Sequence, residues 1–196
     1  MNSKFVKSVL VAATLSLVAS TAFVPAQAAM MAMKTAGTKM VGGAAMYPTK
    51  NIIENAINSK DHTTLVAAVK AADLVATLET KGPFTVFAPT NEAFAALPAG
   101  TVDTLLKPEN KAKLATILTD HVLAGHYDTA DLAAKAKAAG GSVAMKSVGG
   151  ASLTFTVKAG HVYVTDENGG TARITIADVE QSNGVIQVVN KVLLPK

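Results

Sequence analysis

The spacing of apolar residues changes once along this chain, from a helical period to a strand period, and this change restricts the folds open to it. Between residues 49 and 121, apolar side chains recur every three or four positions, as on one face of a helix. From Ser142 onward they alternate with polar ones, as in "SLTFTVK" at residues 152–158. A run of helices followed by a run of strands predicts an α+β domain.

The helical part of the sequence predicts several amphipathic helices, each of which packs one face against the rest of the domain. Thr49 and Thr63 are expected to cap the first two helices, and Thr101 and Pro108 mark the starts of two later ones. In "KLATILTDHVL", at residues 113–123, His121 falls on the apolar face. Because buried polar groups are normally paired, we expect His121 to be a hydrogen-bonded core histidine rather than a ligand or a base.

The strand part predicts a hairpin and a strand with two buried faces. "HVYVT" and "RITIADV", at residues 161–165 and 173–179, also alternate, and "DENGG" between them predicts a turn. The acidic residues of that turn lack the spacing of a calcium loop, so we expect a plain hairpin. Asn183 and Gly184 precede "VIQVV", an almost wholly apolar run that is typical of a strand buried on both faces.

Asp178 interrupts the alternation of residues 173–179. Strict alternation would bury it beside Ile174 and Ile176, and an unpaired buried carboxylate is strongly unfavourable. We therefore expect the strand to end or bulge near Ala177, releasing Asp178 to the surface. There Asp178 either caps the local turn or contacts a partner.

The first 28 residues have the features of a secretory signal peptide. Lys4 and Lys7 form a basic start, "VLVAATLSLVA" is an apolar core, and Ala26-Gln27-Ala28 fits a peptidase cleavage site. Residues 29–46 lack apolar periodicity and predict a flexible lead-in to a domain at residues 47–196. Because the apolar core is too short to span a membrane, the mature chain is expected to be secreted or periplasmic, without a membrane span.

The composition excludes several functions. Cleavage after Ala28 leaves 16 basic and 14 acidic side chains, and Arg173 is the only arginine, so no nucleic-acid partner is predicted. The chain has no cysteine, which excludes disulfides and thiolate chemistry. Its four histidines are scattered and form no zinc-binding motif. The sequence also lacks the G-x-S-x-G motif that holds the nucleophilic serine of many hydrolases. A methionine cluster in residues 29–46 could attract Cu(I), but no histidine or cysteine accompanies it. We expect no cofactor, no metal and no catalytic residue.

The stretch "FTVFAPTNEAF", Phe84 to Phe94, predicts a strand-to-helix corner. The expected roles are packing, ending the strand and capping the helix: Phe84, Phe87 and Phe94 are buried, Pro89 withholds an N–H, and Thr90 or Asn91 is the cap. Its only acid, Glu92, has no base or nucleophile beside it. We therefore interpret this stretch as structural rather than catalytic.

Three segments resemble the characteristic parts of the fasciclin I (FAS1) domain. They are "FTVFAPTNEAFAALP" at residues 84–98, "LTDHVLAGHY" at 118–127 and "SNGVIQVVNKVLLP" at 182–195. The resemblance covers residues 47–196. The first and third segments are called the two FAS1-like blocks, and Asn183 and Gly184 lie in the second of these blocks. It implies the FAS1 fold, a β-sandwich or wedge of about seven strands with several helices packed around one side.

The resemblance also singles out two residue pairs. FAS1 domains commonly carry a Tyr-His pair, proposed in animal members to support integrin binding, where this chain has Asp120-His121. An acidic-isoleucine motif linked to adhesion in animal relatives corresponds here to Asp178-Val179, and Gln187 replaces a histidine of many relatives. The lost tyrosine weakens the case for an integrin. The candidate partner-binding residues are therefore Asp178, Val179, Asp120 and His121.

These observations favour an exported, non-catalytic binding module for cell adhesion or for contact with a surface or matrix protein or polysaccharide. One alternative is a periplasmic carrier for a small apolar ligand, because pockets form between the layers of such folds. Another is a hydrolytic enzyme. No catalytic constellation is visible, but a triad is defined by its geometry and not by its order in the sequence.

Overall fold

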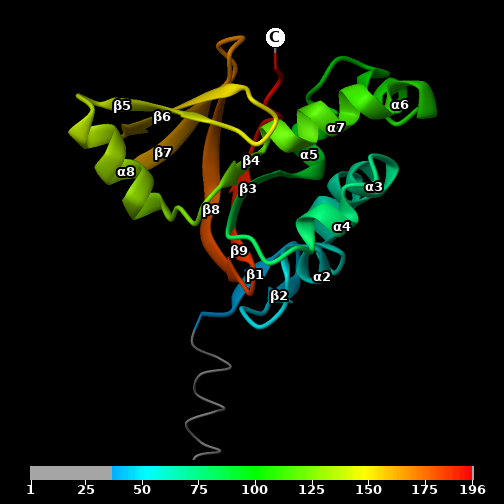
Figure 1. Cartoon of the computed structure of the whole chain (residues 1–196), viewed down its shortest axis with the longest axis horizontal. Coiled ribbons are helices and arrows are strands. Elements are labelled where there is room, and N and C mark those ends of the chain that lie inside the picture. The colour runs from blue at the N-terminus through cyan, green and yellow to red at the C-terminus, as the bar shows by residue number, and fades with distance from the viewer. Residues whose placement is uncertain (1–36, 196) are drawn as a thin grey trace, which may run out of the picture.

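The computed structural model describes residues 37–195, so the predicted signal peptide and the start of the predicted lead-in lie outside the described residues. Seven strands form one curved sheet in the order β4-β3-β9-β8-β7-β6-β5 (Figure 1). Their bounds are β3 (Phe84–Pro89), β4 (Val122–Ala124), β5 (Ser142–Lys146), β6 (Ser152–Lys158), β7 (His161–Thr165), β8 (Thr171–Gln181) and β9 (Gly184–Val189). The predicted α+β class and the predicted seven strands are confirmed.

The pairing of the strands almost closes the sheet on itself. β3 pairs with β9 in parallel, and all other neighbouring strands of this sheet are antiparallel. The predicted "DENGG" turn joins β7 to β8. The chain leaving β5 returns to the opposite edge, where the Val148 N–H donates to the Val122 carbonyl at 2.8 Å. The sheet therefore resembles an incomplete barrel more than an open layer.

Helices cover the two sides of the sheet unequally (Figure 1). One side carries α2 (Ile52–Ala56), η1 (Lys60–His62), α3 (Thr63–Ala71), α4 (Val75–Leu78), α5 (Asn91–Ala95), α6 (Thr101–Leu105), η2 (Pro108–Asn110) and α7 (Lys111–Asp120). The single helix α8 (Thr129–Ala138) packs on β5, β6 and β7 instead. The predicted packing of helices around one side thus holds for all of them except α8.

Two apolar clusters lie on the two sides of β3 and β9. The helix-side cluster joins these strands to the helices and includes Ile52, Ile53, Leu65, Val69, Val86, Ala88, Leu118, Ile186 and Val188. The strand-side cluster lies inside the curve of the sheet, under α8, and includes Phe87, Leu132, Leu153, Phe155, Val162, Val164, Ile174 and Val189. Successive residues of a strand point to opposite faces, so β3 and β9 contribute to both clusters.

Two helix caps differ from the prediction. α2 is capped by Asn51 rather than by Thr49: Asn51 Oδ1 accepts from the Glu54 N–H at 2.8 Å, and Glu54 Oε2 accepts from the Asn51 N–H at 2.8 Å. This reciprocal pair needs an acid three residues after the cap, which Asn51 has and Thr49 lacks. Thr63 is the first residue of α3 and not its cap, because the 3-10 turn η1 leads directly into that helix.

The predicted flexible lead-in is wrong over its described part. β1 (Lys39–Val41) and β2 (Ala44–Met46) form a hairpin whose turn residues, Gly42 and Gly43, have φ values of 57° and 75°. Such a two-residue turn requires positive φ and therefore favours glycine. Val41 and Met46 are each 2% exposed and belong to the helix-side cluster. The folded part of the chain thus includes residues before position 47.

Candidate functional site

Phe84–Phe94 forms the predicted strand-to-helix corner. Phe87 and Phe94 are buried as expected, whereas Phe84, at the first position of β3, is only partly buried. Pro89 is the last residue of β3. Thr90, rather than Asn91, caps α5, and its Oγ1 accepts from the Ala93 N–H at 3.3 Å. Packing, strand ending and capping account for these residues, so the role of the corner is structural.

Two asparagine side chains fasten the helices to the strands. Asn91 accepts from a backbone N–H of α3 at 3.0 Å and donates to a backbone carbonyl of η1 at 2.8 Å. Asn183 accepts from the first N–H of α2 at 3.1 Å and donates to the Leu78 carbonyl of α4 at 2.7 Å. Gly184 follows at a point where a Cβ atom would lie 2.0 Å from the Phe84 carbonyl oxygen. The two FAS1-like blocks therefore hold the helical layer against the sheet.

His121 is the hydrogen-bonded core histidine that the sequence predicts. It is 2% exposed at the end of α7. Its Nδ1–H donates to the Ile117 carbonyl at 2.8 Å, and its Nε2 accepts from the Leu193 N–H at 2.9 Å. Burial lowers the pKa of His121, although the Ile117 carbonyl and the charges of Asp120 and Asp166 act in the opposite direction. The neutral ring joins α7 to the segment after β9.

Asp120 is also turned inward and is 2% exposed. Its Oδ1 accepts from the Ser147 hydroxyl at 2.7 Å and from the Ala151 N–H at 3.2 Å. A Cβ atom on Gly149 would lie 2.3 Å from this oxygen, so the loop after β5 closes tightly over the carboxyl group. Asp120 therefore fastens the two edges of the sheet together, and a partner at the surface does not reach it.

His62 is a second buried histidine, 3% exposed, beneath the β1–β2 hairpin. Its Nδ1 lies 2.9 Å from Ser59 Oγ, whereas its Nε2 has no hydrogen-bond partner among the described residues. Burial lowers the pKa of His62, although the Ala88 backbone and the Asp61 charge act in the opposite direction. Local sequence patterns do not single out this histidine, because the apolar residues that bury it, among them Met46 and Ala88, come from distant segments.

The predicted bulge occurs in β8, where the pairing with β9 shifts register between Ile176 and Val179. Asp178 has a φ of 54° at this point. Its carboxylate is nevertheless occupied: Oδ1 accepts from the Thr129 N–H at 2.7 Å, and Oδ2 accepts from the Thr129 hydroxyl at 2.6 Å. Asp178 is partly exposed, whereas Val179 is 1% exposed and belongs to the helix-side cluster.

Gln187 explains how the bulge is held. Its Oε1 accepts from the Asp178 N–H at 2.9 Å, and its Nε2 donates to Asp178 Oδ1 at 2.8 Å. Partial burial raises the pKa of Asp178, but hydrogen bonds from Gln187 and Thr129 and the charge of Lys39 outweigh it and lower the pKa overall. The carboxylate thus joins β9 and the start of α8 to the bulge.

An exposed ion pair lies two residues from the bulge. His126 Nε2 is 2.9 Å from Glu180 Oε2, and both side chains are about two-fifths exposed, at 41% and 42%. The next two residues point elsewhere: the Tyr127 ring lies beneath the ammonium of a lysine, and Asp128 caps α8. Within residues 37–195 no group of three or more His, Cys, Asp or Glu side chains is placed to hold a metal ion.

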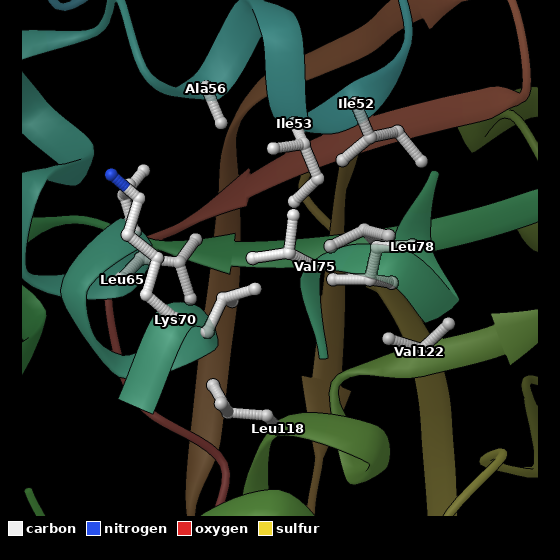
Figure 2. A pocket seen from close by; sticks show the side chains of 12 residues that line it. Ile52, Ile53, Ala56, Leu65, Lys70, Val75, Leu78, Leu118 and Val122 are labelled. Atoms are coloured by element: carbon white, nitrogen blue, oxygen red, sulfur yellow. The ribbon is translucent and has the colours of Figure 1, made fainter. Parts of the chain in front are cut away.

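The helix-side cluster contains an apolar hollow that the sequence did not locate. Figure 2 shows Ile52 and Ile53 reaching from α2 toward Val75 and Leu78 of α4, with Leu118 on the opposite wall. The hollow measures about 490 Å³, including the open space at its mouth. Its twelve lining residues are aliphatic apart from one lysine: Ile52, Ile53, Ala56, Leu65, Val66, Val69, Lys70, Val75, Leu78, Val86, Leu118 and Val122.

The sequence shows the one-faced stripes that build this hollow but not the space between them. Packing density depends on how neighbouring helices approach each other, which the spacing within one helix does not determine. α2 and α4 have only five and four residues, so neither spans the full length of the cluster. Short helices that meet at different angles leave the space unfilled.

Residues 60–195 match the family described as "Fasciclin domain". The match spans more than half of the chain and contains the corner, the buried His121 and the bulge at Asp178. The chain belongs to the fasciclin family. The resemblance inferred from the three sequence segments is thereby confirmed.

Two bacterial relatives and a solved structure agree with this assignment. "Protein sll1483" of Synechocystis is 50% identical over 168 residues, which cover 85% of this chain and 86% of that one. "Immunogenic protein MPB70" of Mycobacterium bovis is 34% identical over 71% of this chain and 66% of its own. A FAS1 domain pair from the insect cell adhesion molecule fasciclin I has the same fold, with a TM-score of 0.65, 19% identity, and coverage of 74% of this chain and 51% of that chain.

The FAS1 fold predicted for this member of the fasciclin family is confirmed. Over residues 37–195, none of the helices combines the length and the apolar character needed to cross a membrane. Of the four candidate partner-binding residues, only Asp178 has appreciable exposure, because Asp120, His121 and Val179 are at most 2% exposed. Whether Asp178 contacts a partner stays a prediction.

Proposed function

We propose that this fasciclin-family chain is an exported, non-catalytic binding module for cell adhesion or for contact with a surface or matrix protein or polysaccharide. Family membership is the observation that carries the proposal. It is supported by the fold that the chain shares with a FAS1 domain pair from an insect cell adhesion molecule. The chemistry of the two FAS1-like blocks agrees with it, because their polar side chains bond to the backbone of the fold.

The contact surface in this proposal is the bulge of β8. Asp178 is partly exposed there, and Glu180, two residues further along β8, contacts the exposed His126 side chain. A backbone held at positive φ by Gln187 presents these groups at a fixed position. A pre-positioned charged corner binds a partner with little loss of side-chain entropy.

Bead adhesion tests the proposal. Beads coated with residues 29–196 are applied to cells of the producing organism, beside beads coated with Asp178→Asn or Thr129→Val. Both variants remove a hydrogen bond of the same corner, but only Asp178→Asn removes a charge. We expect the wild type to adhere, Asp178→Asn to adhere less and Thr129→Val to adhere like the wild type. Adhesion of wild-type beads no better than that of beads coated with an unrelated protein would refute the proposal.

A carrier for a small apolar ligand is the second candidate function, and the hollow of the helix-side cluster favours it. Its lining is almost wholly aliphatic, but its enclosed part holds only about two water molecules, so a ligand enters only when the lining helices separate. Native mass spectrometry of protein purified from its own host is the direct test. A retained small molecule supports the carrier, and a spectrum of the bare polypeptide alone argues against it.

A further inference from the structure

We propose that the hollow between α2, α3 and α4 binds a single-chain fatty acid, with its acyl chain between the helices and its carboxylate at Lys70. The inference rests on the carrier candidate, and it is independent of the adhesion proposal. Four features of the hollow select this ligand: its lining, its width, its mouth and its single charge.

The lining selects an unfunctionalised hydrocarbon. Eleven of the twelve lining residues are alanine, valine, leucine or isoleucine, so the walls offer no side-chain donor or acceptor to a polar ring or a sugar. A ligand with buried hydroxyl or amide groups would leave them unpaired, which is strongly unfavourable. An acyl chain has no such groups, and each methylene that it buries adds to the affinity.

The width of the hollow selects one chain rather than two. Its enclosed part holds about two water molecules, and the rest of its volume opens toward the mouth. An acyl chain therefore enters only when α2 and α4 separate, and rings or paired acyl chains require a wider separation than a single linear chain does. Both helices consist of one turn or slightly more, and the Asn183 side chain bonds to each of them, so the shift must preserve or break one of these two hydrogen bonds.

The mouth exposes apolar surface that an acyl chain would cover. Val66 and Val75 line the hollow and are half-buried, which places them at its edge. Ile57, the residue after the lining Ala56, is 51% exposed. Exposed aliphatic groups beside an apolar hollow are typical of a ligand entrance.

Lys70 supplies the charge that recognises the head group. Its ammonium carries the only nitrogen among the lining side chains and lies at one end of the hollow, near Ala56 (Figure 2). Among the described residues no carboxylate lies within 4.0 Å of it, since the two ion pairs there are Lys111–Asp73 and His126–Glu180. Asp73, three residues further along, is thus already neutralised by Lys111. An anionic head group complements this cation, and a cationic one is repelled.

The experiment titrates residues 29–196 with dodecanoate, dodecanol and dodecyltrimethylammonium, each as a monomer below its micelle concentration. Calorimetry gives the affinity, and methyl NMR locates the ligand. We expect dodecanoate to bind most tightly and to shift the methyl signals of Ile53, Val69, Val75 and Leu118. Equal affinities for all three compounds, or shifts confined to other methyl groups, would overturn the proposal.

Two variants isolate the charge and the space. Lys70→Glu should weaken dodecanoate binding by about tenfold and leave dodecanol unchanged, since an exposed ion pair contributes modestly and reversal adds repulsion. Lys158→Glu, at the end of β6 on the other side of the sheet, is the matched control and should bind as the wild type does. Val75→Phe should block all chain-bearing ligands. Unchanged dodecanoate binding by Lys70→Glu would contradict the assignment even where Val75→Phe fails to fold.

The source of the acyl chain is tested with vesicles of phosphatidylglycerol. Binding to monomeric dodecanoate without binding to vesicles supports a carrier of free fatty acid. Binding to vesicles without binding to the monomer would overturn the proposal and identify the hollow as a membrane-docking surface. Neither result bears on bead adhesion, so the failure of this inference and the failure of the adhesion proposal remain distinguishable.

Discussion

The two apolar clusters are built from similar residues but are filled to different degrees. The strand-side cluster lies between bonded strands and one ten-residue helix, and the fully buried rings of Phe87 and Phe155 meet at its centre, 5.4 Å apart. The helix-side cluster is assembled from separate short helices around a hollow. Strands fixed by hydrogen bonds on both sides cannot shift singly, whereas one-turn helices can.

This difference separates stability from binding. A close-packed cluster loses stability with any change of volume, and it has no space for a ligand. A cluster with a hollow makes fewer van der Waals contacts, so a change of side-chain volume alters its stability less. We therefore expect the strand side to set the stability of the fold and the helix side to tolerate both mutation and occupation.

Truncation of a buried side chain should show the largest contrast. Phe87→Ala, on the strand side, should lower the free energy of unfolding by about 3–5 kcal/mol. Ile53→Ala, on the helix side, should lower it by about 2–3 kcal/mol, because α2 can move into the space. Urea denaturation measures both. Equal losses would show that the helix side is as rigid as the strand side.

Addition of one methylene should separate the clusters by sign. Val164→Ile enlarges a fully buried strand residue and should lower the free energy of unfolding by about 1–3 kcal/mol. Val75→Ile adds the same group at the hollow and should raise it by about 0.5–1 kcal/mol. Thermal melts of the two variants give the comparison, which fails if both variants are destabilised alike.

The bulge at Asp178 lies where the two sides meet. Asn tolerates positive φ, so Asp178→Asn isolates the loss of the charged acceptor from any strain in the backbone. We expect a loss of about 1–2 kcal/mol, moderated by the partial exposure of the group. Thr129→Val should lose a similar amount through the same hydrogen bond. Unchanged melting temperatures in both variants would mean that these hydrogen bonds do not stabilise the fold.

Mild acid should have the smallest effect on the free energy of unfolding, and a buried histidine contributes to that effect in each part of the fold. Burial lowers the folded-state pKa values of His62 and His121, so the unfolded chain takes up protons first as the pH falls. Their contribution to stability is complete above the unfolded pKa of about 6.5 and is lost below it. Between pH 7 and 6 we expect a loss below about 1 kcal/mol for each histidine.

Asp178 has the same proton balance as the two histidines, because its unfolded form also takes up a proton first as the pH falls, but it does so in a lower pH window. Its pKa is lowered in the fold, so its contribution is present above about 3.8 and is lost as the pH falls further. Urea denaturation at pH 7, 6, 4 and 3 separates the two windows. In His62→Gln or His121→Gln, the step between pH 7 and 6 should become smaller. An unchanged step in both variants would contradict the assignment.

Local patterns were sufficient to predict most of the strand side. Alternation located β6, β7 and β8, and the burial expected for "VIQVV" matches β9. The bulge in β8 could be predicted because one acid, Asp178, falls on the apolar face of the alternating pattern. Its partners Thr129 and Gln187 could not, because the contacts join three segments that no local pattern connects.

The helix side was less predictable for two physical reasons. The three-residue strands β1 and β2 are too short to show a period, although Gly42-Gly43 is a typical hairpin turn and was an available signal. The hollow depends on how α2, α3 and α4 meet, which involves no single residue type. Asn51 outcompeted Thr49 as a cap because only Asn51 has Glu54 three positions later.

The parallel pair of β3 and β9 also has a consequence for the time course of folding. Phe84 pairs with Gly184, so the helices between them can form from nearby residues while β3 still lacks a partner strand that lies about a hundred residues further along the chain. Closing so long a loop is slow, because its entropy is lost before the contacts form. Since β9 contributes to both apolar clusters, neither cluster is complete until that strand has paired, and folding of the two sides is coupled through one late contact.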